Sequence, residues 1–215
     1  MRTTGLAVSE PGDDDARLVE RLRARDKAAF AALIDQHHQT LVRLALAYVH
    51  EEATAEEVAQ EAWASVIKNL AGFEGRSSLK TWIFRIAVNA AKTRAAKEKR
   101  STPFSALAPE EPGDEVDPAR FNDSGMWSAP PAAWTADDPE KRLLRAEAME
   151  VLARALDELP AAQRTVVTLR DVEGEDAPTV CNILGITESN QRVLLHRGRT
   201  RLRRALEEYA SERSP

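Results

Sequence analysis

The 215-residue sequence has only one cysteine, Cys181. A single thiol cannot form a disulfide within the chain or supply a cysteine-based zinc site, so both kinds of structural crosslink are excluded. We interpret Cys181 as a small buried apolar residue rather than a redox centre. The four histidines lack the spacing with carboxylates that metal ligation requires. We therefore expect no metal and no other cofactor.

Long apolar runs and strand patterns are also missing. No apolar run approaches the roughly 20 residues of a membrane span, and the amino-terminal segment has no apolar core of a signal peptide. Aromatic residues make up 5% of the chain, and no run of alternating β-branched residues occurs. Alanine, leucine, arginine and glutamate dominate, which predicts an all-α protein. We expect it to be soluble and cytoplasmic, with no membrane partner.

Charge is distributed unevenly along the chain. The net charge is −5, which by itself would argue against binding to nucleic acid. Acidic residues gather in 10–20, 51–61 and 110–138, whereas basic residues gather in 76–100 and 192–204. Salt screens surface fields beyond roughly 8 Å, so the local sign of the charge matters more than the sum.

The chain divides into two helical regions and a linker. We expect a first helical bundle over 15–100 after an acidic, disordered lead-in over 1–14, and a second helical domain over 139–209. Six prolines and a large excess of acid lie between them, which predicts a flexible linker over 101–138. The linker also holds several aromatic residues. They either pack back onto one bundle or dock on a partner.

The first bundle contains two predicted helix starts. Asp26 is placed to cap a long amphipathic helix that ends near His50. Thr54 and Glu57 stand three residues apart before an apolar series, which is the pattern of a capping box. The helix that they open is expected to end near Leu70, with its acidic outer face exposed and unpaired.

The stretch 73–100 carries the densest positive charge. A loop over Gly72–Ser78 leads into a helix that Ser77 or Ser78 caps. The predicted apolar face consists of Leu79, Trp82, Ile83, Ile86, Ala87 and Ala90. From Lys92 onward the pattern is charged on all sides. A basic helix on an apolar anchor suits a polyanion, because neutralised phosphates release counterions. The alternative is an ordinary solvated surface helix.

The carboxy-terminal region predicts a helix-turn-helix. Asp176 is placed to cap a short helix, Gly185 makes the turn, and Thr187 caps a last helix that ends near Tyr209. Polar residues at the start of that helix could contact base edges, and arginines behind them could contact phosphates. We find no nucleophile–base pair, metal-ligand spacing or glycine-rich phosphate loop, so the sequence does not predict an enzyme.

Four segments resemble a known family, the extracytoplasmic-function (ECF) group of bacterial sigma factors. EEVAQEAWASVIKNL resembles the helix by which the family binds core RNA polymerase, and FEGRSSLKTWIFRIAVNAAKTRAAKEKR the segment that melts and reads the minus-ten promoter element. LDELPAAQRTVVTLRDVEG, followed by a helix-turn-helix that ends in LLHRGRTRLR, resembles the domain that reads the minus-thirty-five element. The gap between the two domains is too short for the extra helical domain of larger sigma factors.

The resemblance implies three sets of contact residues. The polymerase set is Glu56, Glu57, Gln60 and Glu61, since carboxylates would repel DNA. The minus-ten set is Arg76, Ser77, Ser78, Lys80, Arg85, Asn89, Lys92 and Lys97. In this segment Asn89 could read an exposed base, and Trp82 could stack on one, although its place in the apolar pattern favours a core role. The minus-thirty-five set is Glu188, Ser189, Asn190, Gln191, Arg192, His196, Arg197 and Arg199.

The sequence departs from the family at the reading helix, where Gln191 and Arg192 stand in place of the usual apolar residue and lysine. The expected partners are polymerase core subunits, promoter DNA as duplex and as melted strand, and an anti-sigma protein. By resemblance, the acidic linker would thread through polymerase. The alternative function is a stand-alone helix-turn-helix regulator with a helical sensor domain, but this leaves the basic stretch 73–100 without a role.

Overall fold

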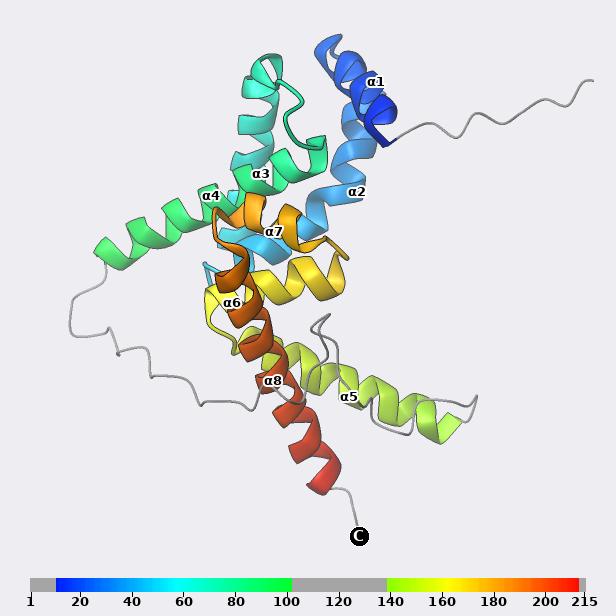
Figure 1. The fold of residues 1–215 in the computed structure, drawn as a ribbon, viewed down its shortest axis with the longest axis vertical. Helices are drawn as coiled ribbons and strands as arrows, with labels where there is room; N and C mark the ends of the chain where they lie inside the picture. The colour runs from blue at the N-terminus through cyan, green and yellow to red at the C-terminus, as the bar shows by residue number, and fades with distance from the viewer. Residues whose placement is uncertain (1–10, 102–138, 213–215) are drawn as a thin grey trace, which may run out of the picture. The chain divides into compact units, whose positions relative to one another are not determined.

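The computed structural model describes residues 11–101 and 139–212, with side chains described for 14–98 and 146–211 (Figure 1). All regular structure in these residues is helical, and the chain splits into two compact units. Residues 1–10 and the segment 102–138, expected as lead-in and linker, lie outside the described residues. No helix in the described parts is long and apolar enough to cross a membrane.

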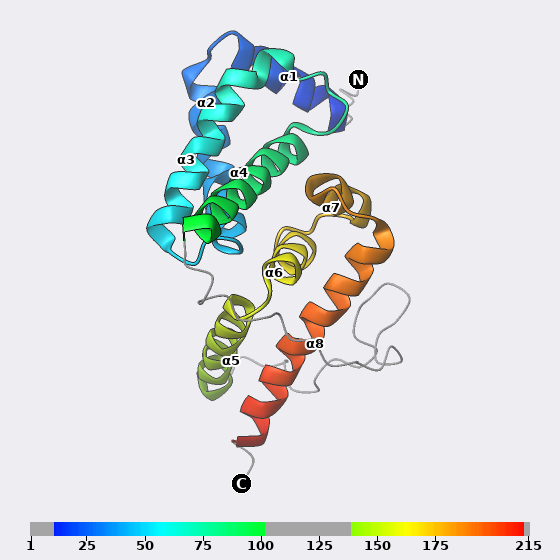
Figure 2. The same cartoon turned by 90° about the vertical axis from the view of Figure 1, so that its left-hand side faces the viewer.

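The first unit is built from four α-helices and a 3₁₀ turn. These are α1 (Pro11–Arg23), α2 (Lys27–Leu46), α3 (Glu52–Asn69), η1 (Leu70–Gly72) and α4 (Leu79–Ser101). The helices α2, α3 and α4 pack on one another, while α1 contacts α2 and η1 (Figure 2). Helix α1 begins within the segment that we expected to be a disordered lead-in, and α2 ends four residues before His50.

The buried face of α4 differs from the predicted one. Leu79, Ile83 and Ala87 are buried as expected, but Trp82, Ile86 and Ala90 are only half-buried. The remaining core positions of this helix are Thr81, Phe84, Val88 and Ala91, and Phe84 and Val88 are 0% exposed. At about 100° per residue, this face is rotated by roughly one residue position from the predicted stripe. The prediction gave too much weight to the large apolar side chains.

The helix starts show which predicted caps form. The Asp26 carboxylate accepts hydrogen bonds from the backbone N–H groups of Ala28 (2.9 Å) and Ala29 (3.1 Å), as predicted. These bonds, with one from Arg21, lower the pKa of Asp26. The capping box at Thr54 is wrong: α3 begins at Glu52, and the Thr54 hydroxyl donates to the Glu51 carboxylate at 3.1 Å.

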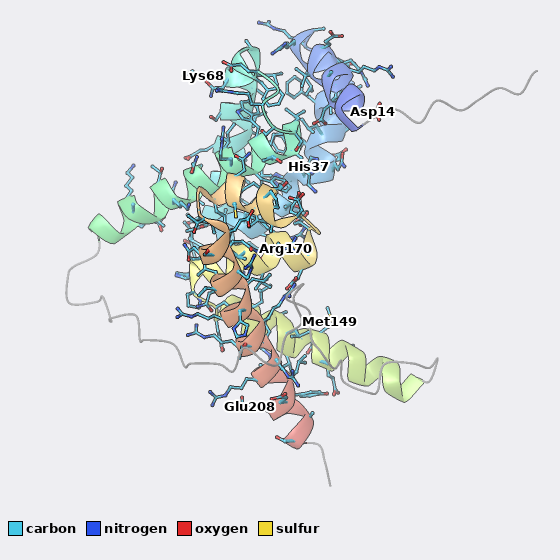
Figure 3. All side chains as sticks on the ribbon, in the orientation of Figure 1. Asp14, His37, Lys68, Met149, Arg170 and Glu208 are labelled. Carbon is cyan, nitrogen blue, oxygen red and sulfur yellow. The ribbon has the colours of Figure 1, made fainter. Side chains whose placement is uncertain are left out.

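The carboxy-terminal region, most of which forms the second unit, contains the predicted helix-turn-helix. Its elements are α5 (Pro139–Asp157), α6 (Ala161–Val167), a π-helical turn η4 (Thr168–Val172), α7 (Ala177–Leu184) and α8 (Glu188–Glu212). Helix α8 packs on α5 and α6 (Figure 2). The expected end of the last helix near Tyr209 is three residues short. Among the labelled side chains in Figure 3, Met149 on α5 is exposed, and Arg170 in η4 donates to the carbonyl of Glu175.

The turn between α7 and α8 has the predicted chemistry. The Asp176 carboxylate accepts from Thr179 N at 2.8 Å, and hydrogen bonds from Thr179 lower the pKa of Asp176. Gly185 ends α7 at a φ of 67°, a left-handed conformation that favours glycine. The Thr187 hydroxyl then accepts from Asn190 N at 3.3 Å and caps α8. Cys181 is half-buried, and burial raises the pKa of its thiol, in keeping with a structural role.

Helix α8 approaches α6 closely at Gly198. A Cβ built there would lie 2.6 Å from Val167 Cγ2 and 3.6 Å from Gln163 Cβ. The absence of a side chain at Gly198 thus lets the two helices pack tightly. This contact sets which face of α8 points inward and which remains available to a partner.

Candidate nucleic-acid interface

The outer face of α4 carries three of the expected DNA-binding residues. Arg85, Asn89 and Lys92 are all exposed. Their spacing of four and three residues places them within about 60° of one another around the helix. The buried Ile83 and Ala87 lie on nearly the opposite side of the helix, so packing turns the polar side chains outward. The result is a short stripe with two positive charges around one amide.

The loop before α4 is held in place from two directions. Phe73 packs on Trp82 with ring centroids 5.1 Å apart, and the Phe73 carbonyl accepts a hydrogen bond from Arg23 Nη2 at 2.6 Å. Trp82 is therefore neither a fully buried core residue nor a fully exposed base-stacking platform. It joins the loop to the half-buried edge of α4, next to the polar stripe.

The start of α4 is fixed by hydrogen bonds from its own serine and from α1. The Ser78 hydroxyl accepts from Thr81 N at 3.1 Å, so Ser78 is the cap. The Asp15 carboxylate accepts from Leu79 N at 2.9 Å and ties α1 to the same helix end. Ser77 donates only to the Ser78 carbonyl, at 3.3 Å. The two serines thus belong mainly to the architecture of the loop.

The remaining expected minus-ten residues have separate surroundings. Arg76 is 84% exposed and lies 3.0 Å from the Glu74 carboxylate. Lys80 Nζ lies 5.4 Å from the centre of the Phe84 ring, which places its charge at the edge of the core. Lys97 is exposed on the last described turns of α4. They do not join the stripe of Arg85, Asn89 and Lys92 as one cluster.

The acidic face of α3 is paired, contrary to our expectation. Arg94 of α4 places Nη2 2.8 Å from Glu57 Oε2 and Nη1 3.7 Å from Glu61 Oε1, and its Nε bonds Glu98 at 3.0 Å. The hydrogen bonds to Glu57 and Glu98 raise the pKa of Arg94. One arginine is shared among three carboxylates, so the surface remains net negative. Both Glu57 (60%) and Glu61 (62%) stay largely exposed.

Two other α3 residues complete this surface. Glu56 Oε2 lies 3.0 Å from His38 Nε2, while Trp63 Nε1 donates to His38 Nδ1 at 3.3 Å. Because Trp63 can only donate, Nδ1 must be the accepting nitrogen, and Nε2 carries the proton toward Glu56. This chain fixes Glu56 against α2. Gln60 is exposed between the two paired regions.

At the start of α8, most of the expected base-reading residues are exposed. They are Glu188, Ser189, Asn190, Arg192 and, one turn later, Arg197. His196 is half-buried. An exposed, mixed polar surface on the second helix of a helix-turn-helix is suited to the major groove.

Two residues of this set have other positions. Gln191 is 3% exposed, because it faces inward with Leu195 and Gly198. Arg199 is bound to Asp171 by two hydrogen bonds, of 2.9 and 2.6 Å, and its side chain is 11% exposed. We therefore remove both from the proposed contact residues. The family commonly has an apolar residue at position 191, and an apolar residue there would have indicated that the side chain at this position is buried.

Some residues that shape these surfaces were not predicted. Asp15 and Arg23 hold the loop and the start of α4, yet they come from a helix distant in sequence. Val193 is 46% exposed on α8, where an apolar side chain gives no sequence signal of a contact with DNA. The described residues contain no group of three or more His, Cys, Asp or Glu side chains that could hold a metal ion.

The buried position of Gln191 leads to a first prediction. Its Nε2 has no hydrogen-bond partner in the described structure, and a buried unpaired amide is costly. Replacing it with the similarly shaped Gln191→Met should raise the free energy of opening of α8 by about 1 kcal/mol. Hydrogen exchange over residues 188–202 of the full chain measures this change, with the exposed Asn190→Met as the control. Binding to duplex DNA should change less than twofold. A loss of binding as large as that of Arg192→Ala would restore Gln191 as a reading residue.

Two family models match the chain. Sigma-70 region 2 matches residues 33–101, and Sigma-70 region 4 matches residues 149–202. Together they span more than half of the sequence. The first match contains α3 and α4 with their outer faces, and the second contains the helix-turn-helix.

Curated relatives and solved structures agree with these matches. The RNA polymerase sigma-H factor of Pseudomonas aeruginosa is 28% identical over 93% of this chain and 97% of its own length. The ECF RNA polymerase sigma-E factor of Escherichia coli K12 is 28% identical over 86% and 90%. The sigma factor RpoE of Bartonella quintana, solved with the anti-sigma factor NepR, shares the fold with a TM-score of 0.57 at 20% identity, covering 83% of this chain and 96% of that one. CnrH, solved with the cytosolic domain of CnrY, has a TM-score of 0.56 at 18% identity, covering 90% and 97%. The chain belongs to the extracytoplasmic-function group of RNA polymerase sigma factors.

Proposed function

We propose that this sigma factor uses three separate helix faces for its three contacts. The outer face of α3 binds core polymerase, the outer face of α4 with its preceding loop binds the melted minus-ten strand, and α8 reads the duplex minus-thirty-five element. The observation that carries this proposal is the arrangement of α4, whose core packing leaves Arg85, Asn89 and Lys92 exposed in one stripe.

The α4 stripe suits a single strand better than a duplex. Unpaired bases expose hydrogen-bonding edges that an amide can read, while flanking cations neutralise the phosphates. Asn89 lies between Arg85 and Lys92 in this way. The loop held by Phe73 and Arg23 supplies a fixed rim beside the stripe. In a duplex the Watson–Crick edges of the bases are paired with each other, so Asn89 could reach only the groove edges.

The α3 face suits a protein partner. Its carboxylates would repel phosphates, and Arg94 leaves it with excess negative charge. A basic surface on core polymerase fits this face and would compete with Arg94 for Glu57 and Glu61. The contact residues proposed here are Glu56, Glu57, Gln60 and Glu61.

The other parts of the chain have proposed roles that follow from the family. We place the two functional domains at 15–100 and 139–209, with 101–138 as the linker between them. The sigma factor acts in the cytoplasm with polymerase and catalyses no reaction itself. An anti-sigma protein is a proposed partner, supported by the complex in which RpoE was solved with the anti-sigma factor NepR.

The polymerase contact can be tested by charge reversal. Glu57→Lys with Glu61→Lys should weaken association with core polymerase about tenfold, because like charges across an interface are costly. The control is Glu20→Lys with Asp35→Lys, which changes the net charge equally at exposed positions on α1 and α2. Arg94→Gln should leave association unchanged or tighten it. If the variant with Glu57→Lys and Glu61→Lys binds core polymerase as tightly as the wild type, with unchanged helicity by circular dichroism, the outer face of α3 is not the polymerase contact.

The two DNA contacts can be separated by Arg192→Ala and Asn89→Ala in the holoenzyme. Arg192→Ala should weaken recruitment to duplex promoter DNA by about 1–3 kcal/mol if it binds a base through two hydrogen bonds. Asn89→Ala should leave recruitment nearly intact but reduce opening, measured by permanganate reactivity of thymines in the bubble. Both assays are run at one salt concentration, since phosphate contacts make affinity salt-dependent. Loss of opening alone in Arg192→Ala, or of duplex binding alone in Asn89→Ala, would reverse the roles.

A further inference from the structure

Val193 occupies an unusual place for an apolar side chain. It is one of four exposed large hydrophobic residues in the described structure, the others being Ile67, Met149 and Val172. A single exposed valine is common on protein surfaces and needs no explanation by itself. Val193, however, lies on the reading helix of the helix-turn-helix, immediately after Arg192.

Its direction on α8 follows from the packing of that helix. The inward positions Gln191, Leu195 and Gly198 are buried, and at about 100° per residue Val193 lies on nearly the opposite side. Ser189, one turn earlier, and Arg197, one turn later, are exposed on the same side. Arg201 continues this row as a further exposed basic residue. Val193 is thus at the centre of the outward face, between a hydroxyl and two positive charges.

The chemistry of the major groove selects one base for such a side chain. Thymine alone presents a methyl group there, at C5, and apolar side chains contact it favourably. Cytosine presents its N4 amino donor at the adjoining position, and a valine placed against that donor would exclude water without replacing the hydrogen bond. Neither serine nor arginine at this position could make the same distinction.

We propose that Val193 is a specificity-determining residue that contacts the 5-methyl group of a thymine in the upstream promoter element. The inference rests on the proposed reading of duplex DNA by α8 and adds the identity of one base to it. Ser189 and Arg197 then lie on either side of that contact, where they can bind the neighbouring bases or the phosphates.

The first test is selection of upstream elements by the holoenzyme from a duplex library randomised in that region. Wild type should enrich thymine at one position that Val193→Ser leaves unselected, while preferences at the other positions persist. The matched control is Val172→Ser, an exposed valine in η4, which should give the wild-type profile. An unchanged thymine preference in Val193→Ser, or no enriched thymine in wild type, would overturn the proposal.

The second test changes the DNA and needs no protein variant. Replacing the selected thymine with uracil removes only the methyl group and should weaken wild-type holoenzyme binding about fourfold, the loss expected for one buried methyl. Val193→Ser should bind the thymine and uracil promoters equally. If wild type also binds both equally, Val193 does not read the methyl group. If Arg192→Ala and removal of the whole upstream element also leave holoenzyme binding unchanged, α8 does not read duplex DNA at all. That result would overturn the proposed role of α8 and not only the role of Val193.

Discussion

The packing of α4 against α2 and α3 is the constraint on which the first unit depends. Phe84 and Val88 are completely buried, and a helix can present only one face to a core. With that face fixed, Arg85, Asn89 and Lys92 must point away from the core of the first unit. Rotating α4 so that these residues face the core would bury two charges without partners, and the free energy of this burial would unfold a small domain. The stability of the fold and the position of the proposed strand-binding stripe therefore have the same cause.

Ion pairs decide which basic residues remain for DNA. Arg94 is held by carboxylates of α3 and α4, and Arg199 is held by Asp171. The Arg94 pairs lie at the surface, where ion pairs contribute little to stability. The larger effect of the Arg94 and Arg199 pairs is to remove some positive charges from the binding surface and to leave others, such as Arg197 and Lys97, exposed. A chain of net negative charge thereby keeps local basic surfaces.

Local chemistry explains which features could be predicted from the sequence. The caps at Asp26 and Asp176 and the turn at Gly185 depend on neighbouring residues, and the structure confirms them. The capping box at Thr54, the inward direction of Trp82 and the unpaired acidic face of α3 were wrong. The acidic face of α3 is paired by Arg94, which lies 37 residues from Glu57 in the sequence, and Trp82 is drawn to Phe73 across the loop. Thr54 bonds Glu51 three residues away because α3 begins earlier than the pattern indicated. The proposed contact residues themselves are positions on helix faces, and which of them touch DNA or polymerase remains a prediction.

We propose that the outer face of α4 meets the promoter only after its strands separate. Site-specific photocrosslinking can detect this order, with a photoreactive amino acid at position 89 and, as a comparison, at position 189 on α8. In holoenzyme–promoter complexes, position 89 should crosslink to unpaired minus-ten bases only under conditions that allow opening. Position 189 should crosslink to upstream duplex in closed and open complexes alike. Equal crosslinking of position 89 to closed duplex, or to polymerase alone in the open complex, would contradict this account.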